Sequence, residues 1–154
     1  MARVPAPEHL KAAVDALSSA TGIEFAITDH VVTGTQLHAV YARQHSLPER
    51  YNQTTGVLGF RIPMNYPDAS PEDCFFLQTS DPLKLASPDP TRNSTDVYRA
   101  SLTPDFLKGT VLADHPALVF SWHLWDRSPW NRRQNTLIDH YTHCLRRFDG
   151  PEHD

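Results

Sequence analysis

Residues 60–76 constrain the fold more than any other part of the chain, because they join two strand-like runs through a shaped turn. The first run alternates apolar and other residues until Pro63, where the missing backbone donor ends a strand. A Tyr66-Pro67 step follows, and a second apolar run starts at Cys74. The segment therefore predicts two consecutive strands with a proline-containing turn between them.

Amphipathic helices are predicted on both sides of the strands. Apolar residues in 7–21 recur at helical spacing, and Gly22 stands where a left-handed cap ends a helix. Residues 135–148 show the same spacing, and Gly150-Pro151 ends that helix.

Four strands are predicted between the helices. Their alternating or continuous apolar runs fall in residues 23–27, 32–41, 58–62 and 74–77, with a hairpin turn at 28–30. Residues 80–114 are predicted to be a long irregular loop with one helical turn near 104–108. We expect one α+β domain over residues 1–154: an N-terminal helix, a four-stranded antiparallel meander, a long loop and a C-terminal helix.

Charge and composition exclude several classes of partner. The chain of 154 residues has a formal charge of -4 and no extended cluster of Lys and Arg, so nucleic-acid binding is not expected. No apolar run approaches the roughly 18 residues of a membrane span. With two distant cysteines and no cationic start followed by an apolar core, we expect a cytoplasmic protein.

The order of these features resembles the ubiquitin-conjugating enzyme superfamily. Tyr66-Pro67 resembles the Tyr-Pro turn between the third and fourth strands of that fold, and Ser128-Pro129 resembles the Ser-Pro step leading into the helix after the active site. Residues 58–76, the segment 122–125 and the last helix are most similar to a bacterial branch, the prokaryotic conjugating-enzyme-like family E. The resemblance implies two partners, an activating-enzyme-like protein and a ubiquitin-like modifier.

The chain departs from the superfamily at its reactive centre. His115-Pro116-Ala117 stands where the resemblance implies a His-Pro-Asn segment, and no cysteine follows before Cys144. A thioester carrier needs a thiolate, which is a strong nucleophile and a good leaving group. Cys74 lies in a short apolar run and Cys144 on the apolar face of the last helix, so both are interpreted as buried structural thiols.

Serine chemistry is the alternative to a thioester. Ser121 or Ser128 would carry the modifier as an oxyester, with His123 as the base or orienting group. Ser121 and His123 would point to opposite faces of an extended segment, and the missing asparagine leaves no visible oxyanion donor. A site of this kind needs strong oxyanion support, which the sequence does not show.

Aromatic and histidine residues near this segment suggest binding sites. Trp122, Trp130 and Arg127 are candidate partner-binding residues, since tryptophan and arginine are enriched in binding hot spots. For Trp122 and Trp125 we favour a role in filling the core beneath the last helix, whereas Trp130 is expected to be exposed. His140, His143 and Cys144 have no second ligand pair at zinc spacing, so we expect solvated histidines and neither metal nor cofactor.

The resemblance implies a bacterial, catalytically silent or non-cysteine subunit of a ubiquitin-like modification pathway, with antiphage defence as the associated process. A noncanonical conjugating enzyme remains the alternative, using a serine or a cysteine made accessible on complex formation. An adaptor domain outside any modifier pathway also remains open, because a fold does not determine a function.

Overall fold

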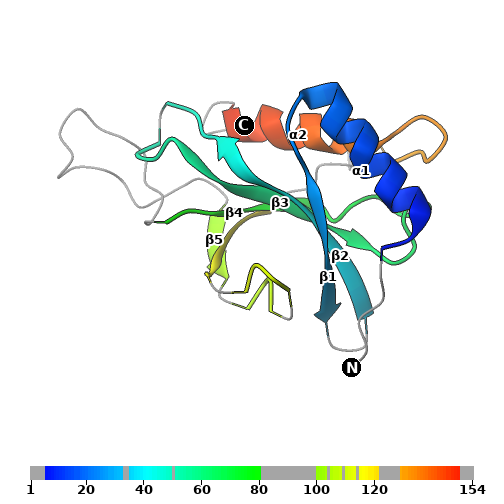
Figure 1. Cartoon of the computed structure of the whole chain (residues 1–154), viewed down its shortest axis with the longest axis horizontal. Helices are drawn as coiled ribbons and strands as arrows, with labels where there is room; N and C mark the ends of the chain where they lie inside the picture. Colours follow the sequence, from blue (N-terminus) through cyan, green and yellow to red (C-terminus); the bar gives the residue numbers. More distant parts are fainter. Residues whose placement is uncertain are drawn as a thin grey trace.

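A six-stranded antiparallel sheet carries two helices on one face, as the computed structural model shows (Figure 1). The structure describes residues 6–32, 35–49, 51–80, 100–103, 105–108, 110–113, 115–121 and 129–149. The predicted α+β class is confirmed. The elements in chain order are α1 (Glu8–Thr21), β1 (Ala26–Val32), β2 (Thr35–Ser46), β3 (Thr55–Pro63), β4 (Cys74–Gln78), β5 (Ala100–Thr103), β6 (Ala117–Ser121) and α2 (Leu137–Asp149).

The sheet is larger than the predicted four-stranded meander. Its strand order is β1-β2-β3-β4-β6-β5, so β6 pairs with β4 and β5 forms an edge. The prediction placed β5 inside a long irregular loop and gave residues 117–121 no strand. These strands have only four and five residues, and their pairing with distant parts of the chain stabilises them more than any local pattern does.

The first hairpin also differs from the prediction. Residues 28–30 lie inside β1 instead of forming its turn, and Val32 is paired with Thr35. The polar residues Asp29 and His30 suggested a turn, but β1 is an edge strand, where charged side chains are tolerated.

The end of α1 agrees with the prediction, whereas α2 begins at Leu137, two residues later than predicted. Gly22 adopts φ 72°, and its N–H donates to the Ser18 carbonyl at 2.9 Å, closing α1. The N–H of Thr136 donates to the Asp139 carboxylate at 2.7 Å immediately before α2.

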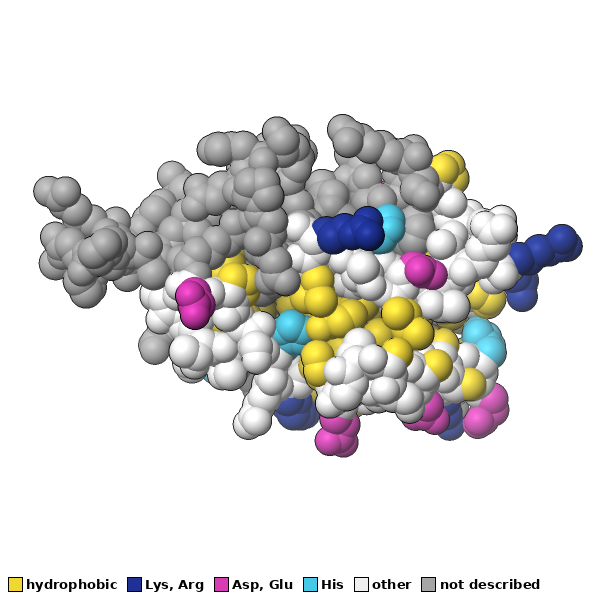
Figure 2. All heavy atoms as spheres, turned by 90° about the horizontal axis from the view of Figure 1, so that it is seen from above, with side chains coloured by type: hydrophobic (Ala, Val, Ile, Leu, Met, Phe, Trp, Pro, Cys, Tyr) yellow, Lys and Arg dark blue, Asp and Glu magenta, His cyan; other side chains and the backbone are white. Residues whose placement is uncertain are grey.

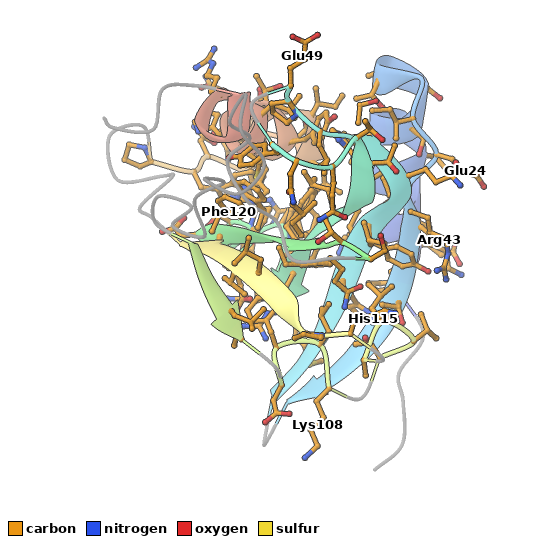
Figure 3. The ribbon with its side chains drawn as sticks, turned by 90° about the vertical axis from the view of Figure 1, so that its left-hand side faces the viewer. Glu24, Arg43, Glu49, Lys108, His115 and Phe120 are labelled. Carbon is orange, nitrogen blue, oxygen red and sulfur yellow. The ribbon has the colours of Figure 1, made fainter. Side chains whose placement is uncertain are left out.

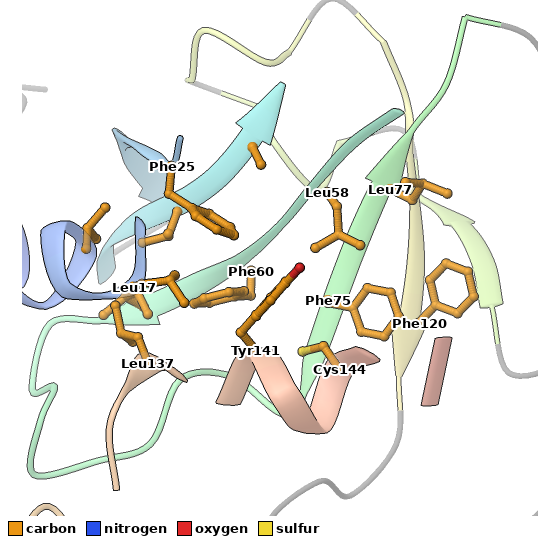
Figure 4. Packing of buried hydrophobic residues seen from close by; sticks show 14 of the residues in the cluster. Leu17, Phe25, Leu58, Phe60, Phe75, Leu77, Phe120, Leu137, Tyr141 and Cys144 are labelled. Atoms are coloured by element: carbon orange, nitrogen blue, oxygen red, sulfur yellow. The ribbon is translucent and has the colours of Figure 1, made fainter. Parts of the chain in front are cut away.

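The main core lies between the helices and the sheet. The rings of Phe75 on β4 and Phe120 on β6 are stacked with their centroids 4.6 Å apart. Tyr141 and Cys144 of α2 belong to the same buried cluster (Figure 4). Seen from the helix side, hydrophobic side chains form a strip across the centre of the face (Figure 2). Burial of these rings, together with the aliphatic side chains of α1 such as Leu17, supplies the driving force that holds the helices to the sheet.

A second, smaller core covers the opposite side of the sheet, here called the outer face. Residues 105–108 and 110–113, which we name the strap, pack Leu107 and Leu112 against Tyr41, Phe76 and Val119. Figure 3 shows Lys108 and His115 on this side, away from the helices. The predicted helical turn near 104–108 is a turn with i to i−3 hydrogen bonds at Phe106 and Lys108.

Candidate functional site

The candidate nucleophiles and base stand in the chain at and after the end of β6. Ser121 is the last residue of that strand, and its Cα is paired with that of Cys74 on β4. The side chain of Ser121 and the residues Trp122, His123, Trp125, Arg127 and Ser128 lie outside the described part of the structure. The proposed nucleophiles, base and two of the partner-binding residues therefore stay predictions.

The Tyr66-Pro67 turn is fixed from two sides. Trp130 Nε1 donates to the Pro67 carbonyl at 2.8 Å, and its ring lies 5.8 Å from the Tyr66 ring. From α1, His9 Nε2 donates to the Tyr66 carbonyl at 3.0 Å, and the two rings are stacked. The Tyr66-Pro67 bond is cis. The turn thus joins α1 to the segment that leads into α2.

Tyr66 acts as a structural residue within this turn. Its side chain is buried, and burial raises its pKa to about 12. The phenol is therefore neutral at physiological pH and does not act as a base there.

An exposed surface surrounds the turn. Met64 is 58% exposed, and Asp68 and Arg132 form an exposed ion pair. We call Met64, Pro67, Asp68, Trp130 and Arg132 the Tyr-Pro surface. Trp130 is half-buried instead of fully exposed, because its indole N–H is bonded to the turn.

Both cysteines of the chain are poor nucleophiles at neutral pH. Cys144 is 0% exposed, and burial raises its pKa well above the usual value. Cys74 is half-buried; burial, and then the negative charge of Glu72, raises its pKa to about 12. Since the thiolate is the reactive form, neither residue is prepared for thioester chemistry in this conformation.

His140 corrects the expectation of solvated helix histidines. It is 0% exposed, and its ring meets Phe60 edge-on at 4.7 Å. Burial lowers its pKa to about 3, so it is neutral at physiological pH. A signal was present in the sequence: His140 lies three residues after Leu137 and four before Cys144, which places it on the apolar face.

A second buried histidine, His45, was not predicted from the sequence. Its Nε2 lies 2.5 Å from the Tyr141 hydroxyl, and its Nδ1 lies 2.8 Å from the Ser46 carbonyl. The His45 and Tyr141 side chains are 96 positions apart, so no local pattern identifies the pair.

The described residues offer neither a metal site nor a membrane span. Within the described ranges, no group of three or more His, Cys, Asp or Glu residues is arranged to hold a metal ion. No described helix is long and apolar enough to cross a bilayer.

Comparisons with known proteins identify no relative. No family model matches the chain, and neither a curated protein nor a solved structure matches it. The structure itself defines the class as an α+β domain with two helices on a six-stranded antiparallel sheet.

Proposed function

We propose that this chain is a partner-binding subunit of a ubiquitin-like modification pathway and does not carry the modifier on a cysteine. The α+β class with both helices on one face of the sheet, and the sequence resemblance to the conjugating-enzyme superfamily, support this proposal. So does the contact between the Tyr66-Pro67 turn and Trp130, which follows the Ser128-Pro129 step directly.

One observation carries the proposal: both thiols of the chain are protonated at neutral pH and at least half-buried. A carrier of an activated acyl group must present an ionised, accessible thiol to its donor and acceptor. A domain without such a thiol can still position an activating enzyme or a modifier. Binding is therefore the role that this geometry supports best.

The Tyr-Pro surface is the proposed contact for the activating enzyme or the modifier. Its backbone is preorganised by hydrogen bonds from His9 and Trp130, so little conformational entropy is lost when a partner binds. Met64 supplies an exposed apolar side chain, and Arg132 with Asp68 supplies exposed charges, the two kinds of group that a binding surface combines.

Binding is tested by co-elution of this protein with an activating enzyme and a ubiquitin-like modifier from the same genome. Met64→Lys should abolish co-elution because it replaces the exposed apolar side chain of the surface with a charged one. Val111→Lys is the matched control, since Val111 is similarly exposed, at 56% against 58%, but lies on the strap. Equal binding by both variants would reject the Tyr-Pro surface as the contact.

Catalysis is tested by intact-mass spectrometry of the same mixture with ATP. The proposal predicts no modifier-sized mass gain on this chain, in the wild type or in Ser121→Ala, Ser128→Ala, Cys74→Ala and Cys144→Ala. A gain that disappears in one variant alone would identify that residue as the nucleophile. It would make the chain a conjugating enzyme and overturn the proposal.

A further inference from the structure

The strap differs from the rest of the fold in how it is held. Its described residues form neither helix nor strand, and their local hydrogen bonds are turns, such as that from the Thr110 N–H to the Leu107 carbonyl at 3.1 Å. Among the described residues, side chains make its contacts with β3 and β4. Segments of this kind open at lower free energy than paired strands do.

One buried side chain holds the C-terminal part of the strap. Gln78 Nε2, at the end of β4, donates to the Leu112 carbonyl and to the His115 carbonyl, each at 2.7 Å. Gln78 is 5% exposed. The two N–H groups of its amide bind backbone carbonyls of residues that lie outside the strands.

Arg61 of β3 holds the N-terminal part. Its guanidinium lies 3.9 Å from the centre of the Phe106 ring, and Nη1 donates to the Phe106 carbonyl at 3.3 Å. The same guanidinium forms an ion pair with Glu72. If the strap opens, Arg61 remains paired with the Glu72 carboxylate. Opening therefore does not leave the Arg61 charge buried without a partner.

The sheet beneath the strap does not depend on it for backbone pairing. β4 is hydrogen-bonded to β3 on one side and to β6 on the other, and the other faces of these strands pack against the main core. Loss of the strap contacts would remove Leu107 and Leu112 from the outer face and leave the ladder intact.

We propose that the strap opens as a unit from the outer face while the sheet and both helices stay folded, with Gln78 as its latch. The two cysteines report on the two cores separately. Cys74 packs against the outer-face cluster, two residues from Phe76 on the same strand, whereas Cys144 lies in the main core. Strap opening uncovers Cys74, and only global unfolding uncovers Cys144.

The test measures the labelling rate of each cysteine in native protein at pH 8.5 with an aromatic disulfide reagent, read by peptide mass spectrometry. Cys74 should react faster than Cys144. Gln78→Leu removes two hydrogen bonds and should raise the Cys74 rate by about 10- to 100-fold, with a smaller change at Cys144. Gln44→Leu, at an exposed position on β2, is the matched control and should leave both rates unchanged.

A second variant keeps the test decisive if Gln78→Leu fails to fold. Phe106→Ala loosens the strap at its other end without altering a sheet residue, and it should also raise the Cys74 rate selectively. Equal acceleration of both thiols, or no acceleration of Cys74 in a folded variant, would overturn the proposal. So would a wild type in which both thiols react together at the rate of global unfolding.

Discussion

Tyr141 of α2 donates its hydroxyl proton to Nε2 of His45 on β2 inside the main core, at 2.5 Å. The direction of the bond follows from the other ring nitrogen. His45 Nδ1 lies 2.8 Å from the Ser46 carbonyl and must donate to it, so the tautomer that satisfies both contacts accepts at Nε2. Both side chains are almost fully buried, at 6% and 5% exposure. The bond therefore connects the C-terminal helix to the second strand through a specific polar contact.

Tyr141→Phe should destabilise the protein by about 1–3 kcal/mol, because it leaves the buried His45 Nε2 without this donor. Urea unfolding followed by circular dichroism measures the change. The double variant His45→Leu with Tyr141→Phe makes both positions apolar. Its loss of unfolding free energy should be smaller than the sum of the losses in the two single variants. Strict additivity would show that the two side chains are not coupled.

Stability should fall as the pH decreases below about 6.5, owing to His140. Burial lowers its folded pKa from 6.5 to about 3, so the unfolded chain binds more protons between these values. The contribution of this residue is complete above pH 6.5 and is lost as the pH falls toward 3. The slope is at most about 1.4 kcal/mol per pH unit. Unfolding free energies at pH 7, 6 and 5 should show a shallower slope in His140→Gln, and an unchanged slope would refute this assignment.

Two contacts of the Tyr-Pro surface should differ in their contribution to stability. Trp130→Phe removes the donor to the Pro67 carbonyl and should cost about 0.5–1.5 kcal/mol. Arg132→Ala breaks an ion pair whose side chains are 56% and 69% exposed, and it should change the unfolding free energy by less than about 0.5 kcal/mol. Chemical denaturation of both variants compares them directly, and the reverse order would show that the indole bond does not hold the turn.

Gly59→Ala should be among the most destabilising single substitutions in the sheet. An added Cβ would collide with the Val40 carbonyl and lie 2.6 Å from the Phe76 ring, so the cost should be about 2–3 kcal/mol. Gly22→Ala meets no atom within 4 Å and is strained only by its left-handed φ of 72°, at a cost of about 1 kcal/mol. Thermal unfolding of the two variants gives the comparison. A larger loss at Gly22 would mean that the sheet can relax around a methyl group.

Helices and the central strands could be predicted because their signals are local. Residues 7–21 combine helical spacing with Gly22 as the cap, and α1 spans Glu8–Thr21 as a result. Pro63 ends β3 for an equally local reason, its missing backbone donor. In contrast, β5 has four residues and depends on β6, from which it is separated by the strap. Its existence follows from long-range pairing that no short window of sequence contains.

The candidate site could be predicted only in part, for a similar reason. The Tyr66-Pro67 step indicated a shaped turn, but its contacts with His9 and Trp130 bring together residues 57 and 63 positions away. The spacing of residues within a short segment does not predict contacts between residues so far apart in the sequence. His140 is a different case, since its helical position already placed it among apolar residues and only its polarity argued for exposure.

The single amide of Gln78 has a consequence for how this sequence can vary in length. Because one nitrogen binds the carbonyls of both Leu112 and His115, the distance between these two carbonyls is fixed. Homologues should therefore exchange residues freely at exposed positions such as Val111 and Ala113, yet show no insertions or deletions between positions 112 and 115. Where a relative does change that spacing, position 78 should no longer hold glutamine.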